Sequence, residues 1–239
     1  MATNQEVLDK IDEYLNESYL QEETTVVPKR TDLTFGNKVK KMKFAVVMYV
    51  DMRKSKAILS DATTFWSVKI HRAFLLALTH CVEKREGHLR SFNGDGILAF
   101  FVGDKASSRA VRAAMDVSGF IAEVNKNLTE QNLKVIDYGI GIAQGVVMVA
   151  KSGKAGDDQT KQDLIWVGLP VYMAVELSDF ARKPKNIWIS NNVRTSIGKE
   201  KCLDVVKNKD GDSKWTKETR EFKSVGKKEV RATIWQFSV

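Results

Sequence analysis

The sequence KFAVVMYVD, residues 43 to 51, is a continuous apolar run, rich in β-branched residues, that ends at an aspartate. A run of this kind predicts a buried strand. A second signal lies at residues 88 to 101, where two apolar segments flank Asn93-Gly94-Asp95-Gly96, a sequence typical of a hairpin turn. The amphipathic segment 60 to 83 between these signals predicts a long helix. Together they begin a β-α-β-β order.

Further along the chain, the pattern continues to alternate helices and strands. We expect a helix over residues 105 to 127, strands within 135 to 149, a polar loop over 152 to 162, a strand at 164 to 167, a helix over 171 to 181, a strand at 186 to 190, and short strands from 200 onward that end with 233 to 237. The order is β-α-β-β-α-β, then β-α-β and a terminal hairpin. The sequence therefore predicts an α+β protein with a ferredoxin-like βαββαβ unit and a C-terminal extension.

The N-terminal segment, residues 1 to 40, is expected to be a helix and a tether that precede a main domain over residues 41 to 239. Val7, Leu8, Ile11 and Leu15 form a helical stripe. A helix this short is marginal by itself. We expect it either to cover part of the sheet of its own chain or to brace a dimer by packing on a second copy.

The composition excludes several classes of protein. The 239 residues are 43% hydrophobic and 28% charged, with 15 Gly and 3 Pro, which excludes collagen-like, low-complexity and disordered chains. No apolar run approaches the roughly 18 residues of a membrane-spanning helix, and the N-terminus lacks the apolar core of a signal peptide. Two cysteines cannot form a disulfide framework. We expect a cytoplasmic protein with no membrane association.

The net charge of +8 is spread along the chain. Such an excess suits nucleic acid, anionic lipid or a polyphosphate substrate. The sequence has no arginine-rich run, zinc-finger spacing or aromatic–basic RNA-binding pattern. We therefore expect no nucleic-acid partner.

Asp51 and Asp95 are the candidate metal ligands. Asp51 ends the first strand of the main domain, and Asp95 lies in the hairpin turn. In a ferredoxin-like sheet the first strand lies beside the hairpin, so both carboxylates are expected at one edge. Carboxylate oxygens are the ligands that Mg²⁺ and Mn²⁺ prefer, and two such ions serve phosphoryl and nucleotidyl transfer. Taken singly, each aspartate also fits an ordinary turn residue.

Residues 52 to 56, MRKSK, offer main-chain N–H groups and cations at the start of a helix, a natural phosphate cradle. A solvated basic turn is the alternative. Other signals fail: the glycines of residues 139 to 145 are misplaced for a dinucleotide fingerprint, no P-loop is present, and the three histidines lack ligand spacing.

Six blocks in order resemble the catalytic domain of the class III nucleotidyl cyclases, from about residue 43 to residue 237. They are YVDMRKS at 49–55, FNGDGILAF at 92–100, YGIGIAQG at 138–145, WVGLPVYMA at 166–174, NIWIS at 186–190 and FKSVG at 222–226. The resemblance implies a homodimer with composite active sites that acts on a nucleoside triphosphate. It also implies two divalent ions, Mn²⁺ or Mg²⁺, held by Asp51 and Asp95, with the Met52 carbonyl as an extra ligand. By the same resemblance, Arg53, Lys54, Ser55 and Lys223 contact the phosphates.

The chain also departs from the family's pattern. Ser91 and Ile165 stand where the purine-selecting lysine and aspartate are expected, and Tyr172 replaces the ribose-orienting asparagine. Glu176 replaces the arginine that stabilises charge on the transition state, so another cation must act there; Arg53, Lys54 and Lys223 are candidates.

These departures resemble the bacterial pyrimidine cyclases of Pycsar anti-phage defence systems. That resemblance implies synthesis of cyclic UMP, or cyclic CMP, for a downstream effector that responds to the cyclic nucleotide. Tyr49, Ser91, Phe92, Asn93 and Ile165 would line a pocket small enough for a pyrimidine. A purine cyclase and a catalytically silent nucleotide-binding module are the alternatives.

Overall fold

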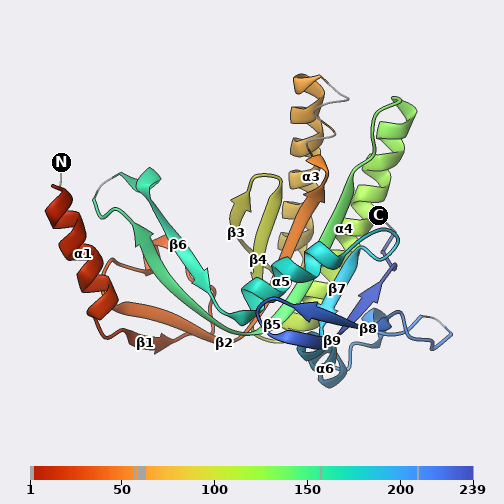
Figure 1. Ribbon diagram of the computed structural model, residues 1–239. Coiled ribbons are helices and arrows are strands. Elements are labelled where there is room, and N and C mark those ends of the chain that lie inside the picture. The colour runs from red at the N-terminus through yellow and green to blue at the C-terminus, as the bar shows by residue number, and fades with distance from the viewer. Residues whose placement is uncertain (1–2, 56–57, 59–62, 157, 209, 239) are drawn as a thin grey trace.

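The computed structural model describes residues 3–55, 58, 63–156, 158–208 and 210–238. Its helices and strands follow the expected order along the chain (Figure 1). They are α1 (Asn4–Asn16), β1 (Leu20–Glu23), η1 (Arg30–Asp32), β2 (Lys38–Arg53), α3 (Thr64–Lys84), β3 (His88–Asn93), β4 (Gly96–Phe101), α4 (Ala106–Glu130), β5 (Asp137–Gly153), η2 (Gln159–Lys161), β6 (Gln162–Val167), α5 (Leu169–Phe180), β7 (Ile187–Ser190), α6 (Asn191–Lys199), η3 (Leu203–Val205), β8 (Thr216–Phe222) and β9 (Gly226–Thr233).

One mixed sheet runs through the part of the chain that the structure describes, with strand order β3-β4-β2-β5-β7-β9-β8. β1 adds to β2 in parallel, and β6 pairs with β5. β2 lies antiparallel to β4, with Val50 opposite Ile97, so the strand that ends near Asp51 neighbours the hairpin as expected. The ferredoxin-like unit and its C-terminal extension are confirmed.

The two faces of the sheet carry separate hydrophobic clusters because side chains alternate along a strand. Val46, Met48 and Val50 of β2 join the cluster that contains buried residues of α3, α4 and α6. Val47, the intervening residue, joins the cluster beneath α5, and Tyr49 packs against it. The helices of the main body therefore cover both faces of the sheet (Figure 1).

Gly139 and Gly141 of β5 let α5 lie directly on the sheet. A Cβ at Gly141 would lie 1.9 Å from the carbonyl oxygen of Ala174, and one at Gly139 would lie 2.3 Å from that of Ser178. No side chain fits there. The glycine-rich block of residues 138 to 145 is thus a packing feature of a strand, in agreement with its rejection as a dinucleotide fingerprint.

The structure differs from the sequence-based expectations at several elements. The tether contains β1, whose parallel pairing with β2 draws the N-terminal segment into the sheet. The strands expected over 135 to 149 are one strand, β5, which continues to Gly153. Helix α6 was not anticipated. The expected strand over residues 233 to 237 is wrong, because β9 ends at Thr233.

Helix α1 begins with a capping box between Thr3 and Glu6, and none of its residues is buried. It therefore does not cover the sheet of its own chain, and it projects from the far end of β1 and β2 (Figure 1). The start of the helix expected from residue 60, at residues 60 to 62, lies outside the described residues, as does Lys56. Within the described ranges, no helix combines the length and the apolar character needed to cross a membrane.

Candidate active site

The carboxylates of Asp51 and Asp95 lie close enough to interact electrostatically, at the end of the sheet where β2 finishes and the β3–β4 hairpin turns. Asp51 lies near the end of β2, and Asp95 lies in the turn between β3 and β4, immediately before Gly96. A Cβ at Gly96 would lie 3.0 Å from Asp51 Oδ1 and 3.1 Å from the Tyr49 hydroxyl. We call Tyr49, Asp51, Asn93 and Asp95 the carboxylate edge.

The electrostatics of the carboxylate edge favour a cation. Partial burial, reinforced by the charge of Asp95, raises the pKa of Asp51, while Arg53 opposes the shift. A divalent ion between the two groups would relieve this repulsion. Within the described residues no cluster of three or more His, Cys, Asp or Glu could hold a metal. Two carboxylates, completed by water and substrate phosphates, nevertheless fit the way proteins bind Mg²⁺.

Tyr49 belongs to the same edge. It shares a face of β2 with Asp51, two residues away, as the strand period requires. Burial, together with the charges of Asp51 and Asp95, raises the pKa of its hydroxyl, and the neighbouring Asn93 side chain opposes the shift. The Ser91 hydroxyl donates to Asn93 Oδ1 over 2.9 Å. Ser91 and Asn93 are therefore joined by a hydrogen bond next to Tyr49 and the carboxylates.

Strand β2 continues past Asp51, where it was expected to end, since Met52 pairs with Tyr138 and Arg53 with Asp137 of β5. The Met52 side chain is buried in the core, so only its main chain is left to serve as a ligand. Lys54, the first residue after the strand, has a left-handed backbone with a φ of 53°, and the half-buried Ser55 follows. The expected cradle is therefore the end of β2 followed by a turn that begins at Lys54.

Arg53 extends beneath α5, where its side chain is only 12% exposed. Its Nη1 lies 3.4 Å from Asp179 Oδ1, whereas Nε and Nη2 are buried without a hydrogen-bond partner in the described structure. Burial and the nearby charge of Arg182 lower its pKa. Sequence reasoning missed Asp179, since no local pattern connects residues 126 positions apart.

A second group of expected site residues lies on α5 and the turn between β8 and β9. Tyr172, on α5, is 54% exposed. Four residues later, the Glu176 carboxylate accepts hydrogen bonds from the Lys223 main-chain N–H (2.8 Å) and the Ser224 hydroxyl (3.1 Å). We call Tyr172, Glu176, Lys223 and Ser224 the helix–hairpin surface.

Ile165 is separate from the carboxylate edge of its own chain. It pairs with Ala150 near the end of β5, whereas Asp51 pairs with Gly139 near the start of that strand. Eleven residues of strand correspond to roughly 35 Å along its path. Within the described residues, no hydrogen bond or ion pair recorded for the structure joins Ile165 or the helix–hairpin surface to the carboxylate edge.

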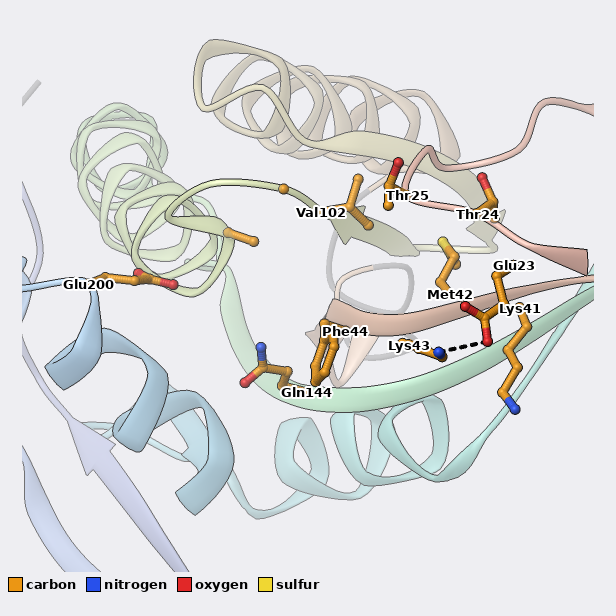
Figure 2. A pocket seen from close by; sticks show the side chains of 12 residues that line it. Glu23, Thr24, Thr25, Lys41, Met42, Lys43, Phe44, Val102, Gln144 and Glu200 are labelled. Carbon is orange, nitrogen blue, oxygen red and sulfur yellow. Dashed lines mark ion pairs between the residues drawn. The ribbon is translucent and has the colours of Figure 1, made fainter.

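A cavity of about 590 Å³ lies elsewhere, around residues 41 to 44 of β2 (Figure 2). Phe44 is seven residues before Asp51, roughly 23 Å along the strand. Charged groups that line the cavity already have partners. Lys43 Nζ lies 2.7 Å from the Glu23 carboxylate, and Glu200 accepts from main-chain N–H groups at the start of α4. This cavity is distinct from the carboxylate edge.

Comparison with known proteins agrees with this geometry. No protein-family model matches the chain. The chain is 26% identical over 201 residues to a uridylate cyclase from Burkholderia cepacia, covering 82% of this chain and 83% of the relative. It is 25% identical over 177 residues to a uridylate cyclase from Xanthomonas perforans, covering 72% of each chain.

The crystal structure of the adenylyl cyclase CyaB from P. aeruginosa superposes with a TM-score of 0.68 at 17% identity, covering 83% of this chain and 97% of that one. The fold is that of a class III nucleotide cyclase. The family resemblance read from the six sequence blocks is confirmed. The cyclase fold places the carboxylate edge on the βαββαβ unit and the helix–hairpin surface on its C-terminal extension.

Proposed function

We propose that this chain is a nucleotide cyclase that converts UTP, with CTP as second choice, into the 3′,5′-cyclic nucleotide and pyrophosphate. The observation that carries the proposal is the pair of carboxylates, Asp51 and Asp95, at one edge of a cyclase fold. The similarity to relatives named uridylate cyclase supports the choice of base.

In the proposed reaction, the 3′ oxygen of the substrate forms a bond to its own α-phosphorus, and the bond to the departing pyrophosphate breaks. The proton of the 3′-hydroxyl is lost as the oxygen attacks. Asp51 and Asp95, with the Met52 carbonyl, would hold two Mg²⁺ or Mn²⁺ ions, which supply charge neutralisation and a more acidic hydroxyl. The protein itself aligns the reacting atoms, so no covalent intermediate is needed.

The charge of the triphosphate is met by the chain's own cations in this proposal. Lys54 and Ser55 follow directly after β2 and would contact phosphate through their main chain and the Lys54 ammonium. The guanidinium of Arg53 lies beneath α5, so its side chain would hold the end of β2 against that helix. Lys223 is the remaining candidate, from the helix–hairpin surface.

Base selection would depend on Tyr49, which lies at the carboxylate edge beside Asn93, the acceptor of the Ser91 hydroxyl. In this proposal the phenol ring would restrict the site to a single-ring base. Because Ile165 lies on β6, far along the sheet from Asp51, it would reach this pocket from a second copy of the chain.

We therefore propose a homodimer with composite active sites. Large apolar side chains are exposed on the elements that carry both groups, a feature typical of interaction surfaces; they are Phe92, Ile165, Val167, Leu169 and Tyr172. A partner would cover these side chains while bringing its own helix–hairpin surface to the carboxylate edge. In this proposal residues 41 to 239 are the catalytic domain, residues 1 to 40 its appendage, and the cytoplasmic product is a signal for an anti-phage effector.

The test is to incubate the full chain with ATP, GTP, CTP and UTP separately, with Mn²⁺, and to identify the products by mass spectrometry. Cyclic UMP or cyclic CMP alone supports the proposal and identifies the base. Cyclic AMP or cyclic GMP as the main product would make the chain a purine cyclase. Nucleotide binding without any product would make it a silent module.

A further inference from the structure

Glu176 joins two elements that are far apart in the sequence. Its two carboxylate oxygens accept from the Lys223 N–H at 2.8 Å and from the Ser224 hydroxyl at 3.1 Å, across 47 and 48 residues respectively. Hydrogen bonds to a charged acceptor are stronger than those between neutral groups. The carboxylate thus fastens the turn between β8 and β9 to the middle of α5.

The hairpin needs such an attachment because β8 is the last strand of the sheet. On one side of the turn, Phe222 is buried and its ring meets that of Phe180 at 5.4 Å between centroids. On the other side, Gly226 has a φ of 65°, which closes the turn. Glu176 fixes the two residues that directly follow Phe222, so the backbone of Lys223 is held from both directions.

The side chain of Lys223 is left available by this arrangement. Glu176 receives its main-chain N–H, and among the described residues no recorded ion pair engages its ammonium group. Tyr172 and Glu176 lie four residues apart and therefore share one face of α5. The ammonium of Lys223 and the ring of Tyr172 consequently belong to one surface.

We propose that Glu176 is a positioning residue: it holds the β8–β9 turn so that the Lys223 ammonium meets the phosphates of the nucleotide. The inference rests on the proposed function, because it assigns Lys223 to the substrate. Glu176 itself does not touch the nucleotide. The Glu176 carboxylate accepts hydrogen bonds from the turn, and the neighbouring Lys223 supplies the positive charge that faces the phosphates.

The experiment combines four variants of the full chain: Glu176→Ala, Glu176→Gln, Lys223→Ala and the double variant Glu176→Ala/Lys223→Ala. Gln retains hydrogen-bonding groups for both partners, so Glu176→Gln is expected to keep near wild-type turnover of UTP. Glu176→Ala is expected to lower kcat about tenfold, a loss typical of a misplaced group that acts on charge in the transition state. The double variant is expected to be no worse than Lys223→Ala, since residues acting as one unit are not additive.

Glu229→Ala is the matched control. Glu229 lies on the same hairpin and pairs with Lys217 and Arg231, and among the described residues it makes no hydrogen bond or ion pair to α5. It is expected to turn over UTP at the wild-type rate. Full activity of Glu176→Ala, or losses that multiply in the double variant, would overturn the positioning role.

A second readout separates this inference from the proposed function. Trypsin cleaves after lysine, so release of the turn by Glu176→Ala is expected to speed cleavage at Lys223 relative to the wild type and to Glu229→Ala. If the wild type forms no cyclic nucleotide, the proposed function fails. The affinity for UTP with Mn²⁺ is then measured for the wild type and the same four variants. Unchanged cleavage at Lys223 in Glu176→Ala would overturn the anchor, whatever the activity.

Discussion

The carboxylate edge and the helix–hairpin surface differ in how the fold makes them. The carboxylate edge is built from β2 and the adjoining β3–β4 hairpin, so strand pairing alone brings Asp51 and Asp95 together. The helix–hairpin surface is built from α5 and an edge hairpin, joined through Glu176. The first group concentrates negative charge, and the second presents a lysine and a tyrosine to solvent.

Under the proposed function, this difference would separate two tasks of a cyclase. Metal ions would be held by β2 and the adjoining hairpin turn, whose positions strand pairing fixes. Substrate contacts would extend to α5 and the β8–β9 turn. The departures from the family's pattern that the resemblance implies fall in both regions, at Tyr172 and Glu176 in the second and at Ser91 beside the first, whereas Asp51 and Asp95 match the pattern.

The largest expected effect comes from removing one carboxylate. Asp51→Ala or Asp95→Ala is expected to lower turnover by about a thousandfold or more, because the ions that neutralise the reacting phosphate lose a ligand. Circular dichroism is expected to show an intact fold. Asp104→Ala, at an exposed position, is the control. Retained activity in either active-site variant would contradict the two-aspartate mechanism.

Mixing two impaired variants tests whether the two regions meet across a dimer. Asp51→Ala damages only the carboxylate edge, and Lys223→Ala damages only the helix–hairpin surface. In a symmetric dimer, random exchange makes half of the dimers mixed, each with one intact site, so these sites are expected to supply about a quarter of wild-type activity. A mixture no more active than the mean of its two components would show that both regions act within one chain.

Tyr49→Phe is expected to weaken the choice of base about tenfold, since it removes the hydroxyl that lies beside Asn93 at the carboxylate edge. The measurement is the ratio of kcat/KM for UTP to that for ATP. Tyr14→Phe, on the exposed helix α1, serves as a control for the loss of a phenol. An unchanged ratio would remove Tyr49 from base selection.

The smallest expected effect is on stability. A raised pKa in the folded state means that the fold binds a proton more readily at Asp51, so its contribution to stability is greatest at low pH and is lost as pH rises through that pKa. At neutral pH, Asp51→Asn is therefore expected to raise the melting temperature of the metal-free protein by about 2 °C. The gain should vanish in acid. A lower melting temperature at neutral pH would contradict the assigned repulsion.

Much of the carboxylate edge could be predicted from the sequence. The apolar run before Asp51 and the Asn-Gly-Asp-Gly turn at residues 93 to 96 are local signals, and the ferredoxin-like order fixes which strands are neighbours. Period two placed Tyr49 beside Asp51. The pairing of β3, β4 and β2 then brings Asn93, which accepts from the Ser91 hydroxyl, next to Tyr49.

The helix–hairpin surface could be predicted from the sequence only in part. Sequence blocks located Tyr172 and Lys223, yet no pattern indicated that Glu176 binds the turn of Lys223 or that Asp179 pairs with Arg53. These contacts span 47 and 126 residues. Helix α6 was not predicted because only two of its residues, Val193 and Ile197, are buried, and the last of the short strands expected from residue 200 onward was extended to residue 237, whereas β9 ends at Thr233.

The sequence by itself determined the order of elements in the βαββαβ unit, the position of the paired aspartates and the family resemblance, because these depend on periodicity and on short segments that act locally. Only the tertiary structure decided where the cations lie. Arg53 turned inward beneath α5 because Gly139 leaves space for its guanidinium, and Lys223 stayed exposed because Glu176 takes its main chain. Such outcomes depend on which distant groups compete for the same partner, and that competition exists only once the chain is folded.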